Sequence, residues 1–211
     1  MAHDNWGCLD SYELPGQPGA RMAWASGLFE GEGCVFSHNG IPGVVVSQTH
    51  ENVLVNLQEV IGGSIYGPYE NGGADGYPRR PIWHLRIRGV QECSEIYARF
   101  ERFLGDRRRG RFQEVLIGES LGATLRPREA LRADCEGIAW AAGLFEAEGC
   151  ISWSGSPILV MGTTDEDVAR SFCNVVGGRL YGPYKRSSQS QSRKPIYSDG
   201  VLPGTPDVAG S

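Results

Sequence analysis

Two pairs of acidic residues recur in the chain at a fixed separation, and their chemistry is the clearest that the sequence offers. Glu30 and Glu32 close one segment, and Glu146 and Glu148 close another, 116 positions later. A carboxylate at a helix C-terminus faces the negative end of the helix dipole, which costs up to about 1 kcal/mol, and a second carboxylate nearby adds to this cost. A divalent cation would offset both effects. Mg²⁺ commonly binds through one or two carboxylates together with phosphate oxygens.

The acids belong to a segment that the chain contains twice. Residues 23–34 (AWASGLFEGEGC) and 139–150 (AWAAGLFEAEGC) are identical at ten of twelve positions. Large apolar residues at helical spacing, followed by glycine, are typical of a short helix that ends at the glycine. Glycine inside a helix costs about 1 kcal/mol relative to alanine. The internal glycines therefore indicate that another backbone approaches closely.

The small and apolar residues fall on one face of each predicted helix when the sequence is plotted at 100° per residue. Small residues four positions apart allow two helices to touch. We therefore expect the two copies to pack on each other, with Glu32 and Glu148 at the edge of the contact and Glu30 and Glu146 away from it. The alternative is that the acids only solubilise the helix ends. The residues of this predicted helix seam are Trp24, Gly27, Leu28, Gly31, Trp140, Gly143, Leu144 and Ala147.

Residues 25–33 and 141–149 resemble the nine-residue motif of the LAGLIDADG, or dodecapeptide, homing endonucleases. Two motifs in one chain are similar to the single-chain members of that family. The resemblance implies an α+β fold of two αββαββα halves related by a pseudo-two-fold axis, with the motif helices as the seam. It also implies that the last acid of each motif, Glu32 or Glu148, binds the catalytic metal, Mg²⁺ or Mn²⁺. Asp is commoner than Glu at this position of the family.

The repeat continues beyond the motif and then stops. Residues 62–69 recur as 177–184, and residues 79–83 recur as 193–197, but residues 198–211 are rich in glycine and proline and contain no basic residue. We therefore expect the second half to be incomplete, without its last strand and the helices that would cover its sheet. The expected divisions are a loose lead-in (1–20), a first half (21–118), a linker (119–136), a second half (137–197) and an irregular tail (198–211).

Basic residues gather in one part of a chain whose formal net charge is -5. Residues 77–112 contain ten arginines against four acidic residues. A strand predicted at 82–88 alternates apolar and basic residues, which gives it one apolar and one basic face. A two-stranded ribbon with such a face fits the major groove of DNA, although biased arginine usage would give the same pattern. The expected DNA contacts are His84, Arg86, Arg88, Arg79, Arg107, Arg108, Arg109, Lys185, Arg186 and Arg193.

The resemblance implies hydrolysis of one phosphodiester in each strand of double-stranded DNA. Arg80 and its counterpart Lys194 begin matching segments, so we expect these two residues to supply a polarising cation. Gln48 closes a predicted strand and is a candidate for positioning water. Three alternatives remain open: a DNA-binding regulator that has lost cleavage, an RNA-splicing maturase, and an inactive truncated remnant. Mobility of a host intron or intein is a further implication of the resemblance.

Composition excludes several other classes of protein. The six cysteines contain no C-x-x-C pair, which argues against a zinc site and gives no reason to expect disulfides. No apolar run approaches 18 residues and no signal-peptide pattern opens the chain, so we expect no membrane partner and a cytoplasmic location. We expect a monomer with pseudo-two-fold symmetry. A dimer becomes possible if the incomplete second half exposes its sheet.

Overall fold

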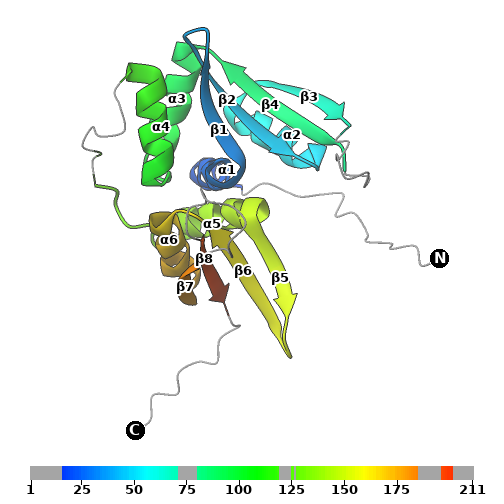
Figure 1. The fold of residues 1–211 in the computed structure, drawn as a ribbon, viewed down its shortest axis with the longest axis vertical. Coiled ribbons are helices and arrows are strands. Elements are labelled where there is room, and N and C mark those ends of the chain that lie inside the picture. The colour runs from blue at the N-terminus through cyan, green and yellow to red at the C-terminus, as the bar shows by residue number, and fades with distance from the viewer. Residues whose placement is uncertain (1–15, 71–79, 119–124, 126, 185–195, 202–211) are drawn as a thin grey trace, which may run out of the picture.

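The chain folds into two similar halves on either side of two central helices (Figure 1). The computed structural model describes residues 16–70, 80–118, 125, 127–184 and 196–201. Each half contains an antiparallel four-stranded sheet, with strand orders β1-β2-β4-β3 and β5-β6-β8-β7. The expected α+β fold with paired halves is confirmed. Among the described helices, none has the length and apolar composition that a membrane crossing requires.

The first half follows the predicted order and ends with two further helices. Its elements are α1 (Pro18–Glu32), β1 (Gly33–His38), β2 (Ile41–Gln48), α2 (Glu51–Ile61), β3 (Ser64–Tyr69), β4 (Ile82–Arg88), α3 (Val90–Phe100) and α4 (Asp106–Ile117). The first three residues of α1 lie within the expected lead-in. Pro18 is tolerated there because the first helical N–H has no partner within the helix.

The second half repeats the first as far as its fourth strand. Its elements are α5 (Cys135–Glu148), β5 (Gly149–Trp153), β6 (Pro157–Thr163), α6 (Glu166–Val176), β7 (Arg179–Tyr184) and β8 (Ile196–Val201). Helix α5 begins within the expected linker, where the Asp134 side chain accepts a hydrogen bond from the Gly137 N–H at 2.9 Å. This contact caps the helix, since it satisfies one of its first free N–H groups.

The prediction that the second half lacks its last strand was wrong. Strand β8 extends to Val201 and pairs with β6 on one side and β7 on the other. The expected boundary at residue 197 therefore falls inside a strand. Residues 198–200 are Ser, Asp and Gly, which have low strand propensity. A position between two strands supplies backbone partners on both edges, and this context overrides propensity.

The inner faces of the two sheets are covered unequally. In the first half Val35 and Val44 are 3% and 1% exposed, because α3 and α4 pack over them together with α1 and α2. Their counterparts by register, Ile151 and Leu159, are 70% and 37% exposed. Trp153, further along the same face, is 73% exposed. Within the described part of the chain, no helices corresponding to α3 and α4 follow β8.

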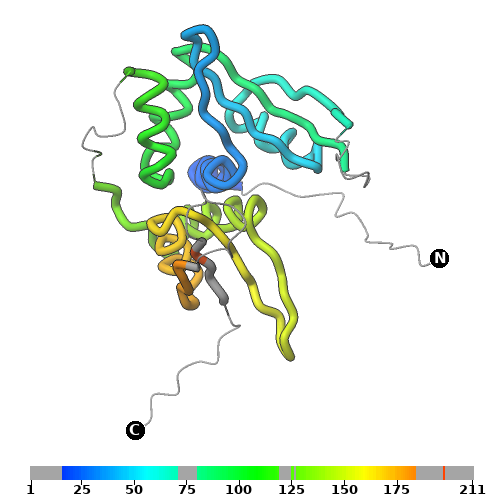
Figure 2. Tube along the Cα trace, viewed as in Figure 1, coloured from blue at the N-terminus to red at the C-terminus, as the bar shows by residue number. Residues whose placement is uncertain are grey.

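Helices α1 and α5 form the contact between the halves and lie side by side at the centre of the molecule (Figure 2). Trp24, Leu28, Trp140 and Leu144 are buried there. The closest approach is reciprocal. A Cβ atom on Gly27 would overlap the carbonyl oxygen of Trp140, and a Cβ atom on Gly143 would overlap that of Trp24.

A second set of contacts joins the halves near the start of α4. Arg107 of α4 pairs with Asp165, which precedes α6, at 2.7 Å between Nε and Oδ2. The Asp106 N–H donates to Asp167 of α6 at 2.9 Å. Arg128 donates to the Phe103 carbonyl oxygen on one side and to the Asp167 carbonyl oxygen on the other. The terminal helices of the first half therefore also brace the second.

The same region ties α4 to the end of α1 through a buried charge pair. Glu30 is 3% exposed, accepts a hydrogen bond from the Gly105 N–H at 2.8 Å and lies 3.8 Å from the guanidinium of Arg108. Arg108 also donates to the carbonyl oxygens of Glu30 and Gly31. These carbonyls belong to the last turn of α1, which has no partners for them within the helix. Arg108 therefore caps α1 and opposes its dipole.

Substitution of Gly27 by alanine should destabilise the protein, even though alanine favours helix by about 1 kcal/mol. The added methyl group meets backbone, which cannot move aside as a side chain can, and overpacking of this kind typically costs about 1–3 kcal/mol. Urea unfolding should show a lower free energy of unfolding for Gly27→Ala and for Gly143→Ala. The control is Gly162→Ala, because a Cβ atom there meets no atom within 4 Å. Equal stability of all three variants would contradict a seam set by backbone contact.

The buried pair should make stability depend on pH. Burial raises the pKa of Glu30 from 4.5 to about 7, against the opposing effects of Arg108 and the Gly105 N–H. Between these two values the folded protein keeps a proton that the unfolded chain has released. The free energy of unfolding should therefore fall as pH rises through this window, by up to roughly 3 kcal/mol, and then level off. Urea unfolding at a series of pH values measures the slope. Glu30→Gln should flatten it, and an unchanged slope in that variant would assign the effect to other groups.

Candidate functional site

The two motif carboxylates lie at adjacent helix ends. Helix α1 ends at Glu32 and α5 ends at Glu148. A Cβ atom on Gly31 would lie 3.0 Å from Cγ of Glu148, so the last turns of the two helices touch. The contacts along the seam advance in the same direction on both helices, from Gly19 beside Glu136 to Gly31 beside Ala147. This arrangement brings the two C-terminal ends together.

The electrostatics of the pair reflect this proximity. Burial raises the pKa of Glu32, and the positive charge of Arg108 opposes the shift. Burial also raises the pKa of Glu148, and the negative charge of Glu32 raises it further. Two carboxylates at adjoining helix C-termini, one of which raises the proton affinity of the other, form a region of concentrated negative potential. The site therefore favours a cation.

The donor atoms available at this point are few and of one kind. Among the described residues, no group of three or more His, Cys, Asp or Glu side chains gathers as a metal site. Glu32 and Glu148 offer carboxylate oxygens, which are the ligands that Mg²⁺ and Mn²⁺ prefer. Mg²⁺ normally keeps several waters and completes its coordination with substrate phosphates. The two side chains therefore fit a metal that a phosphate-bearing substrate helps to bind.

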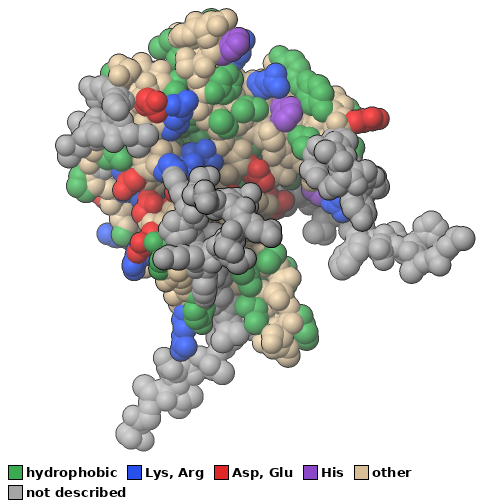
Figure 3. Space-filling model, viewed as in Figure 1, with side chains coloured by type: hydrophobic (Ala, Val, Ile, Leu, Met, Phe, Trp, Pro, Cys, Tyr) green, Lys and Arg blue, Asp and Glu red, His purple; other side chains and the backbone are tan. Residues whose placement is uncertain are grey.

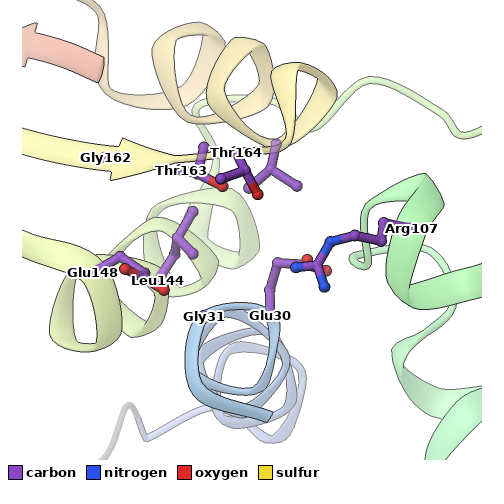
Figure 4. A pocket seen from close by; sticks show the side chains of 9 residues that line it. Glu30, Gly31, Arg107, Leu144, Glu148, Gly162, Thr163 and Thr164 are labelled. Carbon is purple, nitrogen blue, oxygen red and sulfur yellow. The ribbon is translucent and has the colours of Figure 1, made fainter. Parts of the chain in front are cut away.

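A cleft of about 280 Å³ opens beside Glu148, between the two halves. Figure 4 shows Glu30 on α1 and Arg107 on α4 pointing toward one another on one side of this cleft, with Glu148 on the other. Thr163 and Thr164, which precede α6, are also part of the lining. The cleft therefore carries charged groups of both signs.

The outer face of the first sheet forms a broader groove of about 480 Å³. The Ser47 hydroxyl lies 2.8 Å from Nδ1 of His84, and the guanidinium of Arg86 lies 5.6 Å from the centre of the Tyr66 ring. Burial, and then the charge of Arg86, lower the pKa of His84. The lowered pKa favours the neutral form of His84, which can both donate and accept a hydrogen bond. The groove is lined by Phe36, His38, Val45, Ser47, His84, Arg86 and Arg88.

Side chains of both charges are visible on the face shown in Figure 3. Histidine and arginine or lysine side chains are visible over the strands of the first half, and acidic side chains are present where the halves meet. Arg86 and Arg88 are exposed on β4, whereas the alternating residues Leu85 and Ile87 are buried. The predicted division of this strand into a basic and an apolar face is therefore present.

The other residues expected at the site are placed as follows. Gln48 is half-buried at the end of β2, opposite Trp83 of β4. Arg80 is exposed, and its guanidinium lies 3.2 Å from Nε2 of His50. Five more expected residues, namely Arg79, Lys185, Arg186, Arg193 and Lys194, lie outside the described residues.

The expectation that Arg108 and Arg109 contact DNA phosphates was wrong. Their side chains are 10% and 3% exposed, so neither presents its guanidinium to a ligand at the surface. Arg108 caps α1, and Arg109 pairs with Asp106 at 3.2 Å. Arg107 is partly exposed and is paired with Asp165. The spacing of Arg108 and Phe112 could have indicated this outcome, since residues four apart share one helix face and Phe112 is apolar.

The fold is similar to solved structures of DNA-bound endonucleases. The LAGLIDADG homing endonuclease I-GzeII in complex with its DNA target is 10% identical, with a TM-score of 0.55 over 85% of this chain and 77% of that one. I-LtrWI bound to target DNA is 13% identical, with a TM-score of 0.55 over 88% and 79%. The meganuclease I-AabMI bound to uncleaved DNA is 16% identical, with a TM-score of 0.54 over 85% and 78%.

Comparison of the sequence alone finds no relative: no family model matches the chain, and no curated protein matches it. At identities of 10–16% the structural similarity establishes the fold. Both central helices carry the motif residues quoted above, and each leads directly into its own four-stranded sheet. The chain therefore has the LAGLIDADG homing endonuclease fold, as its repeated motif predicted.

Proposed function

We propose that this protein is a site-specific, metal-dependent endonuclease that cleaves double-stranded DNA. The observation that carries the proposal is the meeting of Glu32 and Glu148 at the touching C-terminal ends of α1 and α5. Each half of a pseudo-symmetric protein thereby contributes one carboxylate, and a duplex likewise presents one phosphodiester from each strand. Because one chain supplies both carboxylates, the proposed active form is a monomer.

The first sheet supports DNA as the substrate. Arg86 and Arg88 project from β4 into a groove that also contains neutral hydrogen-bonding groups, such as the Ser47 and His84 pair. Arginine contacts with phosphates supply affinity, whereas contacts with base edges supply specificity. A groove that combines both kinds of group fits a protein that selects among DNA sequences. Four further residues that lie outside the described part of the chain are also proposed DNA contacts, namely Arg79, Lys185, Arg186 and Arg193.

The proposed roles of the site residues follow from their chemistry. Glu32 and Glu148 hold the metal, and Arg108 limits the repulsion between them because its charge opposes the rise in the pKa of each. Bound Mg²⁺ would activate a water molecule and stabilise the charge that develops on the leaving oxygen. Arg80 is the proposed polarising cation and Gln48 the proposed water-positioning residue of the first half. Lys194 is the corresponding proposal in the second half.

One observation favours a second candidate function, sequence-specific DNA binding without cleavage. The inner face of the second sheet is largely uncovered at Ile151 and partly uncovered at Leu159. Burying a side chain of this size is worth about 1.5–3 kcal/mol, so the second half is less firmly held than the first. A loosely held second half would position Glu148 poorly while leaving the groove of the first sheet intact.

Cleavage of a randomised duplex library in Mg²⁺ tests the proposal. The wild-type protein should yield cut duplexes that share a sequence. Glu32→Gln and Glu148→Gln should each reduce the cleavage rate by at least about 100-fold, because each removes a carboxylate that holds the metal, whereas binding of the selected duplex should persist. Sequencing of the cut ends and a gel-shift measurement give the two readouts.

The matched control is Glu146→Gln. Glu146 belongs to the same motif and lies two residues before Glu148, but it is exposed on the opposite side of the helix end. This variant should retain full cleavage. Equal loss in all three variants would point to a general effect of charge and overturn the assignment. Binding without cutting by the wild type would favour the second candidate.

A further inference from the structure

The two sheets carry matching rows of side chains on their outer faces. One row crosses all four strands of the first sheet, and each of its residues lies opposite the next. In strand order the row is Cys34 of β1, Val45 of β2, Arg86 of β4 and Ser64 of β3. Residues paired across strands share a face. Arg86 is exposed while its neighbours Leu85 and Ile87 are buried, so this row faces outward.

The second sheet repeats this row with its arginine on a different strand. Cys150 of β5 lies opposite Val160 of β6, which lies opposite Gly200 of β8, and Gly200 lies opposite Arg179 of β7. Each row therefore contains Cys, Val, one Arg and one small residue. The small residue is Ser64 on the edge strand of the first sheet and Gly200 on the inner strand of the second. The arginine is therefore on the inner strand β4 in the first sheet and on the edge strand β7 in the second.

The two rows lie at equal distances from the candidate metal site. Cys34 is the second residue after Glu32, and Cys150 is the second residue after Glu148. Each sheet also has an exposed tyrosine on this face. Tyr66 follows the row by two residues on β3, and Tyr181 follows it by two residues on β7. Arg86 and Arg179 are both exposed. The pseudo-two-fold axis relates the two rows, and within them the two arginines differ by one strand position, about 4.8 Å. A long, flexible arginine side chain can span this offset, so the two guanidinium groups would reach equivalent steps of a duplex centred on the acids.

Arginine that reaches the major groove from a sheet pairs most often with guanine, since its two N–H groups match O6 and N7. We propose that Arg86 and Arg179 each read a guanine at matching positions of the two half-sites, so that the target has G·C pairs placed symmetrically about its centre. This inference rests on the proposed DNA-binding function. It adds a second-half residue, Arg179, to the expected DNA contacts.

The matching arginines should be confined to this row. One row further out, Arg88 lies opposite Gly43, which lies opposite Phe36. The described residues at the corresponding place in the second sheet are Ser152 and Ile158, which carry no charge. Recognition beyond the matching guanines should therefore differ between the two half-sites.

Selection of bound sequences from a randomised duplex library tests this inference. Bound duplexes are recovered in Ca²⁺ in place of Mg²⁺ and sequenced for the wild type, Arg86→Ala and Arg179→Ala. The wild type should show guanine at two positions equidistant from the centre of the site. Each variant should lose the preference at one of them, with about tenfold or greater loss of discrimination there, and keep it at the other.

The strand exchange allows a sharper version of the same test. Ser64→Arg combined with Arg86→Gly gives the first row the arrangement of the second, and it should restore the guanine preference that Arg86→Gly alone removes. The control is Arg170→Ala, which removes an exposed arginine of α6 that pairs with Glu166. This variant should leave both preferences unchanged.

The outcomes separate failure of the inference from failure of the proposed function. Uniformly weaker binding to all sequences in Arg86→Ala and Arg179→Ala, with an unchanged base preference, would identify phosphate contacts and overturn the inference alone. A wild-type site without symmetric guanines would do the same. If the wild-type protein selected no DNA sequence, both proposals would fall.

Discussion

The close contact between the backbones of α1 and α5 determines the geometry of the rest of the molecule. Gly27 and Gly143 each leave room for a carbonyl oxygen of the opposite helix, so the helices approach more closely than any residue with a side chain at those positions would permit. Each helix leads without a loop into the first strand of its sheet. The separation of the helices therefore sets the separation of the acids and that of the two outer faces at once.

The chain is symmetric in its seam and asymmetric in what surrounds the seam. Glu30 is enclosed by α4 and neutralised in part by Arg108, whereas its counterpart Glu146 is exposed. Arg108 lowers the pKa of both Glu32 and Glu148 against the effect of burial, so a cation from one half influences the acids of both. The first half acts as the framework on which the second is held, through the seam and through the contacts of Arg107 and Arg128.

The sequence predicted the features that recur within it. A motif present twice identified the seam residues, and the alternation from Trp83 to Arg88 identified the two faces of β4. Features that depend on contacts between distant segments were missed. Arg108 follows Arg107 in a basic run, and only the packing of α4 on α1 distinguishes a buried cap from a surface charge. Strand β8 was missed because its residues have low strand propensity and its stability comes from the strands on either side. The pairing of Arg179 with Gly200 required the register of the second sheet.

The uncovered inner face of the second sheet makes local unfolding of this half easier than that of the first. Segments with few buried apolar contacts open at a lower free energy than the global transition, and Ile151, Leu159 and Trp153 lie in such a segment. Strand β5, which carries Ile151 and Trp153, follows Glu148 directly, so fraying of this hairpin would loosen the carboxylate nearest to it. Under the proposed function, a metal and a duplex that engaged both halves would bind only the form in which this hairpin is folded, and mass action would stabilise that form in proportion to their affinity. The proposed substrate would then complete the folding of the proposed site.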